Sequence, residues 1–131
     1  MDHHDHVRLL RDGVTGAGSR WADLGSGEGA FTLALADLLG PTGAIHTIDR
    51  DRRALQVQLV ALRDRFPTVT VTPLVADFTT LLELPSLDGI VMANSLHFER
   101  HKLPVLRLVA GYLRPGGARG ACGARNGASS P

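Results

Sequence analysis

Residues 21–30 read WADLGSGEGA, and this stretch decides the fold. An apolar run of strand-forming character ends at Asp23, glycines follow at alternate positions from Gly25 to Gly29, and a helix-forming run begins at Ala30. The pattern predicts a strand, a tight glycine turn and a helix. Glycine lets the backbone approach a ligand closely, and the start of a helix directs amide N–H groups at it. The stretch therefore predicts a site for a nucleotide-like cofactor.

The rest of the chain alternates in the same way between strand-like and helix-like segments. Helices are expected at 7–11, 30–39, 52–66 and 102–113, and strands at 20–24, 44–48, 69–75 and 87–93. Such alternation implies βαβ units and a parallel sheet. Ligands of parallel sheets bind at the carboxyl ends of the strands. The polar residues expected there, one for each strand, are Asp23, Asp49, Asp77 and Asn94.

Composition limits the function classes that remain. The 131 residues are 44% hydrophobic, which suits one domain with its own core. The formal net charge is only +1 with both signs interspersed, so nothing indicates nucleic-acid binding. A single cysteine excludes an internal disulfide, and no apolar run is long enough to span a bilayer. Without a signal peptide, the expected location is the cytoplasm.

Taken in order, these motifs resemble the class I, Rossmann-like methyltransferases that use S-adenosylmethionine. The resemblance covers residues 7–117, and its matching segments are Asp23–Gly29, Ile48–Asp51, Val75–Phe78, Asp88–Val91 with Asn94–His97, and Tyr112–Gly117. It implies an α/β three-layer sandwich around a mostly parallel sheet, with S-adenosylmethionine as the cofactor and methyl transfer as the activity.

Each matched position also has a chemical reason. The expected cofactor-binding residues are Asp23, Gly25, Ser26, Gly27, Gly29, Asp49, Arg50, Asp77, Phe78 and Asn94. Asp23 would place negative charge near the cationic end of the cofactor, and Asp49 would accept hydrogen bonds from both ribose hydroxyls. Asp77 would accept from the adenine amine, which Arg50 and Phe78 would flank. The alternatives are a strand-end cap for Asp49, a helix cap for Asp77 and a solvated charge for Arg50.

Methyl transfer from a sulfonium needs alignment more than side-chain chemistry. His97, three residues after Asn94, is the candidate general base, because neutral imidazole accepts a proton near pH 7. A structural histidine is the alternative. The fourth strand ends in Asn-Ser-Leu-His, unlike the Asn/Asp-Pro-Pro-Tyr/Phe of amino-directed nucleic-acid methyltransferases. A small-molecule acceptor is therefore expected, with neither nucleic acid nor membrane as a partner.

Two other interpretations rank lower. Residues 25–30 also fit the G-x-G-x-x-A pattern of NAD(P)- or flavin-binding domains. A carboxylate at Asp23, inside the strand, suits a cationic cofactor better than a pyrophosphate. The N-terminal histidines His3, His4 and His6 lack a spacing that would place two metal ligands on one helical face, so a polar lead-in to the first helix is expected instead of a metal site.

The end of the chain departs from the family pattern. Residues 116–131 contain no Val, Ile, Leu, Met, Phe, Trp or Tyr. This composition is typical of a disordered segment, so we expect a domain at 1–117 and a low-complexity tail at 118–131. Strands five to seven would then be missing or disrupted, as in a truncated or frameshifted product. The fourth strand would become an exposed sheet edge, which favours dimerisation, and a cofactor-binding remnant without catalysis is a further alternative.

Overall fold

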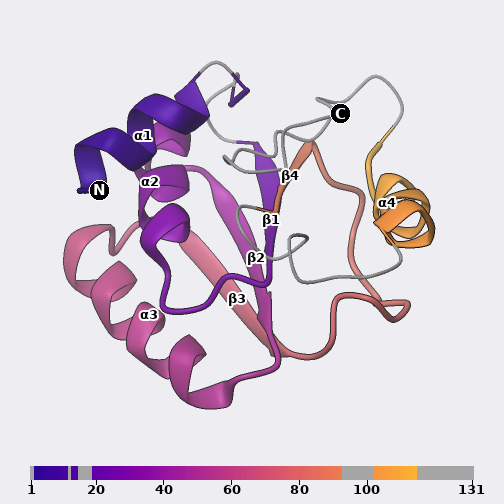
Figure 1. The fold of residues 1–131 in the computed structure, drawn as a ribbon. Coiled ribbons are helices and arrows are strands. Elements are labelled where there is room, and N and C mark those ends of the chain that lie inside the picture. The colour runs from indigo at the N-terminus through magenta and orange to yellow at the C-terminus, as the bar shows by residue number, and fades with distance from the viewer. Residues whose placement is uncertain (1, 12, 15–18, 93–101, 115–131) are drawn as a thin grey trace.

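The computed structural model describes residues 2–11, 13–14, 19–92 and 102–114, and Figure 1 shows the fold. The strands are β1 (Arg20–Leu24), β2 (Ala44–Asp49), β3 (Thr70–Val75) and β4 (Gly89–Val91), and the helices are α1 (His3–Arg11), α2 (Ala30–Leu39), α3 (Arg52–Arg65) and α4 (Lys102–Ala110). All strand pairs are parallel, in the order β3-β2-β1-β4. The predicted Rossmann-like α/β class is thereby confirmed. None of the described helices is long and apolar enough to cross a membrane.

Side-chain alternation along β1 divides the core between the two faces of the sheet. Trp21 is fully buried among α1, α2 and α3, whereas Ala22 and Leu24 pack with α4 and with the segment that joins β3 to β4. The connections β1–α2–β2 and β2–α3–β3 run in the same direction, so right-handed crossovers place both helices on one face. Figure 1 shows α4 on the other side of the sheet. The result is the three-layer sandwich that the sequence predicts.

The register brings the polar strand ends to one edge of the sheet. Asp23 pairs with Thr47 on β2 and with Val91 on β4, and Asp49 pairs with Val75 on β3. The chain adds strands outward from β1 to β3 and then returns to the other side of β1 for β4. The carboxyl ends of β1 and β4 thus form the switch point, where open α/β sheets bind ligands. The glycine turn follows β1 at this point.

Several element bounds differ from the expected ones. Helix α1 begins at His3 instead of residue 7, because Asp2 and Asp5 cap its first turn: the Asp5 amide donates to Asp2 Oδ1 at 3.0 Å, and the Asp2 amide donates to Asp5 Oδ2 at 3.3 Å. Strand β3 begins one residue later than expected, and β4 is shorter than 87–93. Residues 93–101 lie outside the described part of the chain.

Helix α4 ends at Ala110, not at residue 113, because the chain turns and pairs with the start of the β4 segment. The Leu87 amide donates to the Tyr112 carbonyl, and the Arg114 amide donates to the Leu87 carbonyl, both at 2.9 Å. Asp88 reinforces this contact, since its carboxylate accepts from the Arg20 amide at 2.8 Å and pairs with the Arg114 guanidinium. The predicted helix was therefore too long by one turn.

Candidate functional site

The glycine turn after β1 is sharply bent and attached to β2. Gly25, Gly27 and Gly29 have φ angles of 71°, 59° and 97°, in the region that side chains disfavour. The amides of Gly25 and Ser26 donate to the Ile48 carbonyl at 2.7 and 3.1 Å. Three positive φ angles in five residues explain why this turn is built from glycine, and the two hydrogen bonds hold its first half against the end of β2.

The turn leads directly into helix α2. Gly29 is its N-cap residue, and among the residues that the structure describes no side chain accepts a hydrogen bond from the first amides of the helix. The first amides of a helix have no acceptor within the helix, and they favour a negative group. A ligand with a carboxylate or phosphate would be suited to this position.

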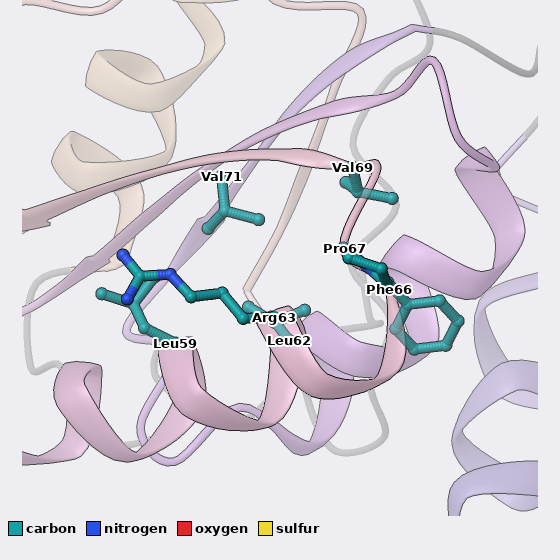
Figure 2. A pocket seen from close by; sticks show the side chains of 7 residues that line it. All are labelled: Leu59, Leu62, Arg63, Phe66, Pro67, Val69 and Val71. Carbon is teal, nitrogen blue, oxygen red and sulfur yellow. The ribbon is translucent and has the colours of Figure 1, made fainter.

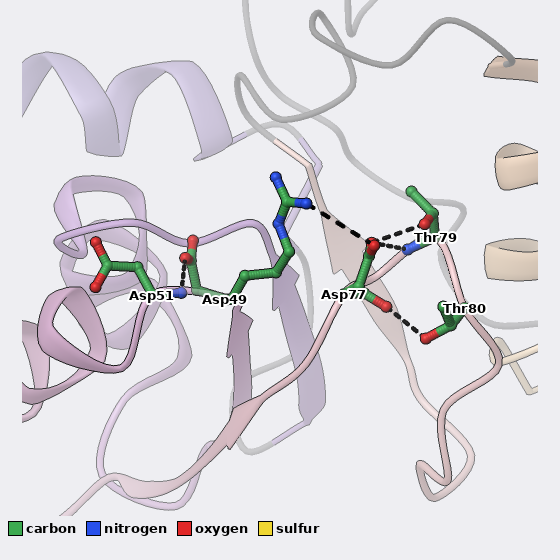
Figure 3. Close-up of polar contacts among 6 residues, drawn as sticks. Asp49, Asp51, Asp77, Thr79 and Thr80 are labelled. Carbon is green, nitrogen blue, oxygen red and sulfur yellow. Dashed lines mark hydrogen bonds and ion pairs between the residues drawn. The ribbon is translucent and has the colours of Figure 1, made fainter.

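Asp49 connects the turn to the end of β2. Its Oδ2 accepts from the Gly27 amide and its Oδ1 from the Asp51 amide, both at 2.8 Å (Figure 3 shows the second contact). The alternative of a strand-end cap therefore describes what this carboxylate does in the structure. Each carboxylate oxygen can accept a second hydrogen bond, so the same group can also bind a diol. The half-buried side chain joins two motifs that lie 22 residues apart.

Asp77 caps a turn at the end of β3. Its Oδ1 accepts from the Thr79 amide at 2.9 Å and from Thr79 Oγ1 at 2.7 Å, and its carbonyl accepts from Thr80 Oγ1 at 2.7 Å (Figure 3). The hydrogen bonds from Thr79 lower the pKa of Asp77, and the Arg50 guanidinium, 4.0 Å away and 79% exposed, lowers it further. The alternative of a helix cap is wrong, because residues 76–88 contain no helix.

Asp23 lies behind the turn and is almost completely covered. The residue is 1% exposed, and Thr32 Oγ1 of α2 donates to its Oδ2 at 2.7 Å. Burial raises the pKa of Asp23 to about 7, and the nearby Asp49 carboxylate also raises it, whereas the bond from Thr32 acts in the opposite direction. The group therefore changes charge near neutral pH, and a cation that binds close by would favour its ionised form.

The remaining predicted residues are placed only in part. Phe78 is half-buried and packs against the core under α4. Asn94 and the candidate base His97 lie outside the described residues. The structure thus brings together the glycine turn, Asp23 and Asp49, and it places Arg50, at the end of β2, 4.0 Å from Asp77, at the end of β3.

A polar cluster behind the turn joins Ser26, which the sequence predicts for the site, to Thr47 and Gln58, which it does not. Gln58 of α3 donates through Nε2 to the Gly27 carbonyl at 2.6 Å and to Ser26 Oγ at 2.8 Å. Thr47 Oγ1 of β2 lies 2.5 Å from Gln58 Oε1 and 2.6 Å from Ser26 Oγ. One signal in the sequence could have identified Gln58: it is a polar residue at helical spacing between Leu55 and Leu62, on the face that packs on the sheet.

Two cavities lie between α3 and β3, and the glycine turn lines neither of them. The first, of about 180 Å³, is shown in Figure 2 and is lined by Leu59, Leu62, Arg63, Phe66, Pro67, Val69 and Val71. The second, of about 360 Å³, is lined by Arg52, Leu55, Gln56, Leu59, Pro73, Leu74 and Val75. Both linings are largely apolar, so these cavities lack the carboxylates that would recognise the polar groups of a cofactor.

The N-terminal histidines attach α1 to its neighbours. His3 Nε2 and Asp37 Oδ2 lie 3.0 Å apart, and the His6 ring packs edge-on against Phe31 with 4.5 Å between ring centroids. Among the described residues, no group of three or more His, Cys, Asp or Glu side chains is arranged to hold a metal ion.

Comparison with known proteins supplies independent evidence of the family to which the chain belongs. A family model described as a methyltransferase domain matches residues 22–117. The curated "Probable cobalt-precorrin-6B C(15)-methyltransferase (decarboxylating)" of Thermoplasma volcanium is 30% identical over 88 residues, which are 67% of this chain and 43% of that protein. The chain therefore spans less than half the length of this relative.

Two solved structures illustrate the similarity of fold. TrmN from Thermus thermophilus is 28% identical, with a TM-score of 0.73 over 86% of this chain and 35% of that one. A SAM-dependent methyltransferase from Aquifex aeolicus is 22% identical, with a TM-score of 0.70 over 85% of this chain and 59% of that one. In both cases the described elements correspond to only part of the larger structure.

Proposed function

This chain belongs to the methyltransferase domain family, and on that premise we propose that it binds S-adenosylmethionine at the glycine turn and acts in methyl transfer to a small-molecule acceptor. The observation that carries the proposal is the hydrogen bond from the Gly27 amide to Asp49 Oδ2. It places a carboxylate with spare acceptor capacity directly beside a turn that ends in an uncapped helix start.

The residues present fit the chemical groups of this cofactor. Asp49 can accept from the ribose hydroxyls while it still holds Gly27, and the start of α2 suits the carboxylate of the amino-acid part. Asp23 supplies negative charge close to a cationic ligand, because a nearby positive charge lowers its raised pKa. When bound, the cofactor supplies a methyl group that its sulfonium already activates.

The other site residues extend this proposal beyond the turn. Arg50, Asp77 and Phe78, at the ends of β2 and β3, would surround the adenine, although Asp77 also holds its own turn. Asn94 would complete the cofactor site, and His97 would accept a proton from the acceptor. The family match argues against the NAD(P)- or flavin-binding alternative. The small-molecule acceptor, the cytoplasmic location and dimerisation through a sheet edge stay predictions from the sequence.

Calorimetric titration with S-adenosylhomocysteine tests the proposal. The chain should bind it and should not bind NAD. Asp49→Ala should weaken binding at least about 100-fold, because it would lose two hydrogen bonds to a charged group, which contribute about 1.5–3 kcal/mol each. Asp64→Ala, at an exposed position on α3, is the matched control and should bind like the unchanged protein.

The possible results separate the three interpretations. Absence of binding, or equal affinity in the Asp49 and Asp64 variants, would overturn the proposed site. Binding of NAD in place of S-adenosylhomocysteine would support a dinucleotide domain. A methyltransferase assay on the same protein distinguishes an enzyme from a remnant, since binding without turnover on a broad set of small-molecule acceptors favours the remnant.

A further inference from the structure

Gln58 is a polar side chain in an apolar setting. It is fully buried on the face of α3 that packs on the sheet, one turn from Leu55 and one turn from Leu62. A buried amide destabilises a protein unless its donors and acceptor are paired. The hydrogen-bond partners of Gln58 therefore indicate why a polar residue is accommodated here.

Those partners lie on the glycine turn and on β2. The Gly27 carbonyl can only accept, so the amide nitrogen of Gln58 must face it, at 2.6 Å, and the side-chain oxygen must face Thr47, at 2.5 Å. The single hydroxyl hydrogen of Thr47 goes to that oxygen. Ser26 then accepts from Gln58 and donates to Thr47, 2.6 Å away. The three side chains form a closed ring in which each polar hydrogen has an acceptor.

Gly27 is consequently held on both of its sides. Asp49 accepts from its amide, and Gln58 donates to its carbonyl. A trans peptide unit is planar, with its C=O and N–H groups pointing in opposite directions. Because Gln58 draws the Gly27 carbonyl toward α3, the amide of Glu28 in the same peptide unit is directed away from α3. Within the described residues, the Glu28 amide has no hydrogen-bond acceptor.

Helix α3 also contacts the turn too closely for any side chain at residue 29. A Cβ atom placed on Gly29 would lie 2.5 Å from the Cβ atom of Gln58. The turn therefore rests on the α3 backbone at Gln58, and Gln58 fixes the orientation of the peptide unit above it.

We propose that Gln58 is a positioning residue: by holding the Gly27 carbonyl it aims the Glu28 amide at the cofactor site and keeps the turn in its binding conformation. The expected effect of Gln58 on ligand binding rests on the proposed function. The geometry of the peptide unit does not depend on the identity of the ligand.

The test compares two glutamines of the same helix. Gln58→Met keeps the size of the side chain and removes its hydrogen bonds, and Gln56→Met makes the same change at an exposed position of α3. We expect Gln58→Met to weaken the binding of S-adenosylhomocysteine at least about tenfold, because an unpaired carbonyl lets the turn leave its binding conformation. Gln56→Met should change the affinity less than about twofold. Far-UV circular dichroism at the titration temperature verifies that both variants are folded.

Amide hydrogen exchange without ligand provides a second readout. Exchange at Gly27 and Gly29, whose amides donate to Asp49 Oδ2 and to the Ser26 carbonyl, should accelerate at least about tenfold in Gln58→Met, whereas amides inside α2 should change little. If the unchanged protein fails to bind S-adenosylhomocysteine, the proposed function fails, and exchange still decides the role of Gln58. If the protein binds and Gln58→Met binds equally well with unchanged exchange, the positioning role is overturned.

Thr47→Val keeps the test valid even if Gln58→Met does not fold. This variant removes the hydroxyl that orients Gln58 and should weaken binding by a smaller factor. Combined with Gln58→Met, it should add nothing to the loss of affinity, because both changes break the same ring. Full affinity in Thr47→Val, or additive effects in the double variant, would contradict the proposed ring.

Discussion

The aspartates at the carboxyl ends of β1 and β3 occupy similar positions at one edge of the sheet, yet their environments are opposite. Asp23 is 1% exposed, and burial raises its pKa to about 7. The side chain of Asp77 is 39% exposed, and hydrogen bonds from Thr79 lower its pKa. At neutral pH, Asp77 is a fixed negative charge, whereas Asp23 is close to its point of half-ionisation.

The difference arises from the segment of chain that comes after each aspartate. After Asp23 the glycine turn reverses the chain so tightly that α2 covers the carboxyl group and offers it one hydroxyl, from Thr32. After Asp77 the chain forms an open turn in which both the backbone and the side chain of Thr79 donate to the carboxylate. The same residue type is thus suited to respond to a ligand in one place and to hold a loop in the other.

The largest expected effect comes from Asp23→Asn, measured as a change of stability with pH. The folded-state pKa lies above the ordinary 3.8, so the folded protein retains a proton that the unfolded chain has lost. Relative to Asp23→Asn, the free energy of unfolding of the unchanged protein should therefore fall as the pH rises from about 4 to about 7. Above pH 7 the difference between the two proteins should stay constant. The difference between the two proteins should change by about 4 kcal/mol over this range, at 1.36 kcal/mol for each unit of the pKa shift.

Urea unfolding at pH 4.5, 6 and 8 measures this difference. Asp64→Asn, at an exposed position on α3, is a suitable control, and its difference from the unchanged protein should vary much less. Parallel stability curves for Asp23→Asn and the unchanged protein would show that Asp23 ionises normally, and the contrast with Asp77 would disappear.

The second-largest effect is expected from Gly29→Ala, which disturbs the glycine turn that follows β1. A φ of 97° disfavours any side chain, and the added Cβ would lie 2.5 Å from that of Gln58, so we expect a loss of about 3 kcal/mol. Gly27→Ala is the matched control: its φ of 59° is also positive, but no atom lies within 4 Å, and a loss of about 1–2 kcal/mol is expected. Urea unfolding measures both, and equal losses would contradict the close contact with α3.

Glycines and prolines at the ends of helices and strands explain how much of the fold could be predicted. The bounds of β1 and α2 agree with the expected ones because glycines mark the turn on one side and Gly40 marks the helix end on the other. Pro67 similarly follows the end of α3. The end of α4 carries a glycine too, Gly111, directly after Ala110, but the apolar residues Tyr112 and Leu113 follow it and extend the expected helix; in the structure Leu113 pairs with Leu87 instead. That contact joins residues far apart in the sequence.

The candidate site shows the same division. The glycine turn and the strand-end carboxylates could be predicted, because each is marked by residue type and by its place at the end of a strand. The burial of Asp23 and the ring around Gln58 could not, because both arise only when helices pack over the turn. Residue type identified the chemical groups, and tertiary packing determined which of them are covered, tied or exposed.

The smallest expected effect concerns the Asp77 side, where two causes of one pKa shift can be ranked. Thr79→Val removes the side-chain donor, and Arg50→Gln removes an exposed charge 4.0 Å away. A carboxyl group with a lowered pKa in the folded state stabilises the fold when the pH is above its ordinary pKa. This stabilisation is lost as the pH falls through the folded-state pKa, so each change should cost less than about 1 kcal/mol at pH 7 and less in acid. NMR titration of the Asp77 carboxyl should show a larger upward pKa change in Thr79→Val than in Arg50→Gln. The opposite order would mean that the ion pair between strand ends, rather than the local turn, fixes this charge, and the contrast between Asp77 and Asp23 would be wrong.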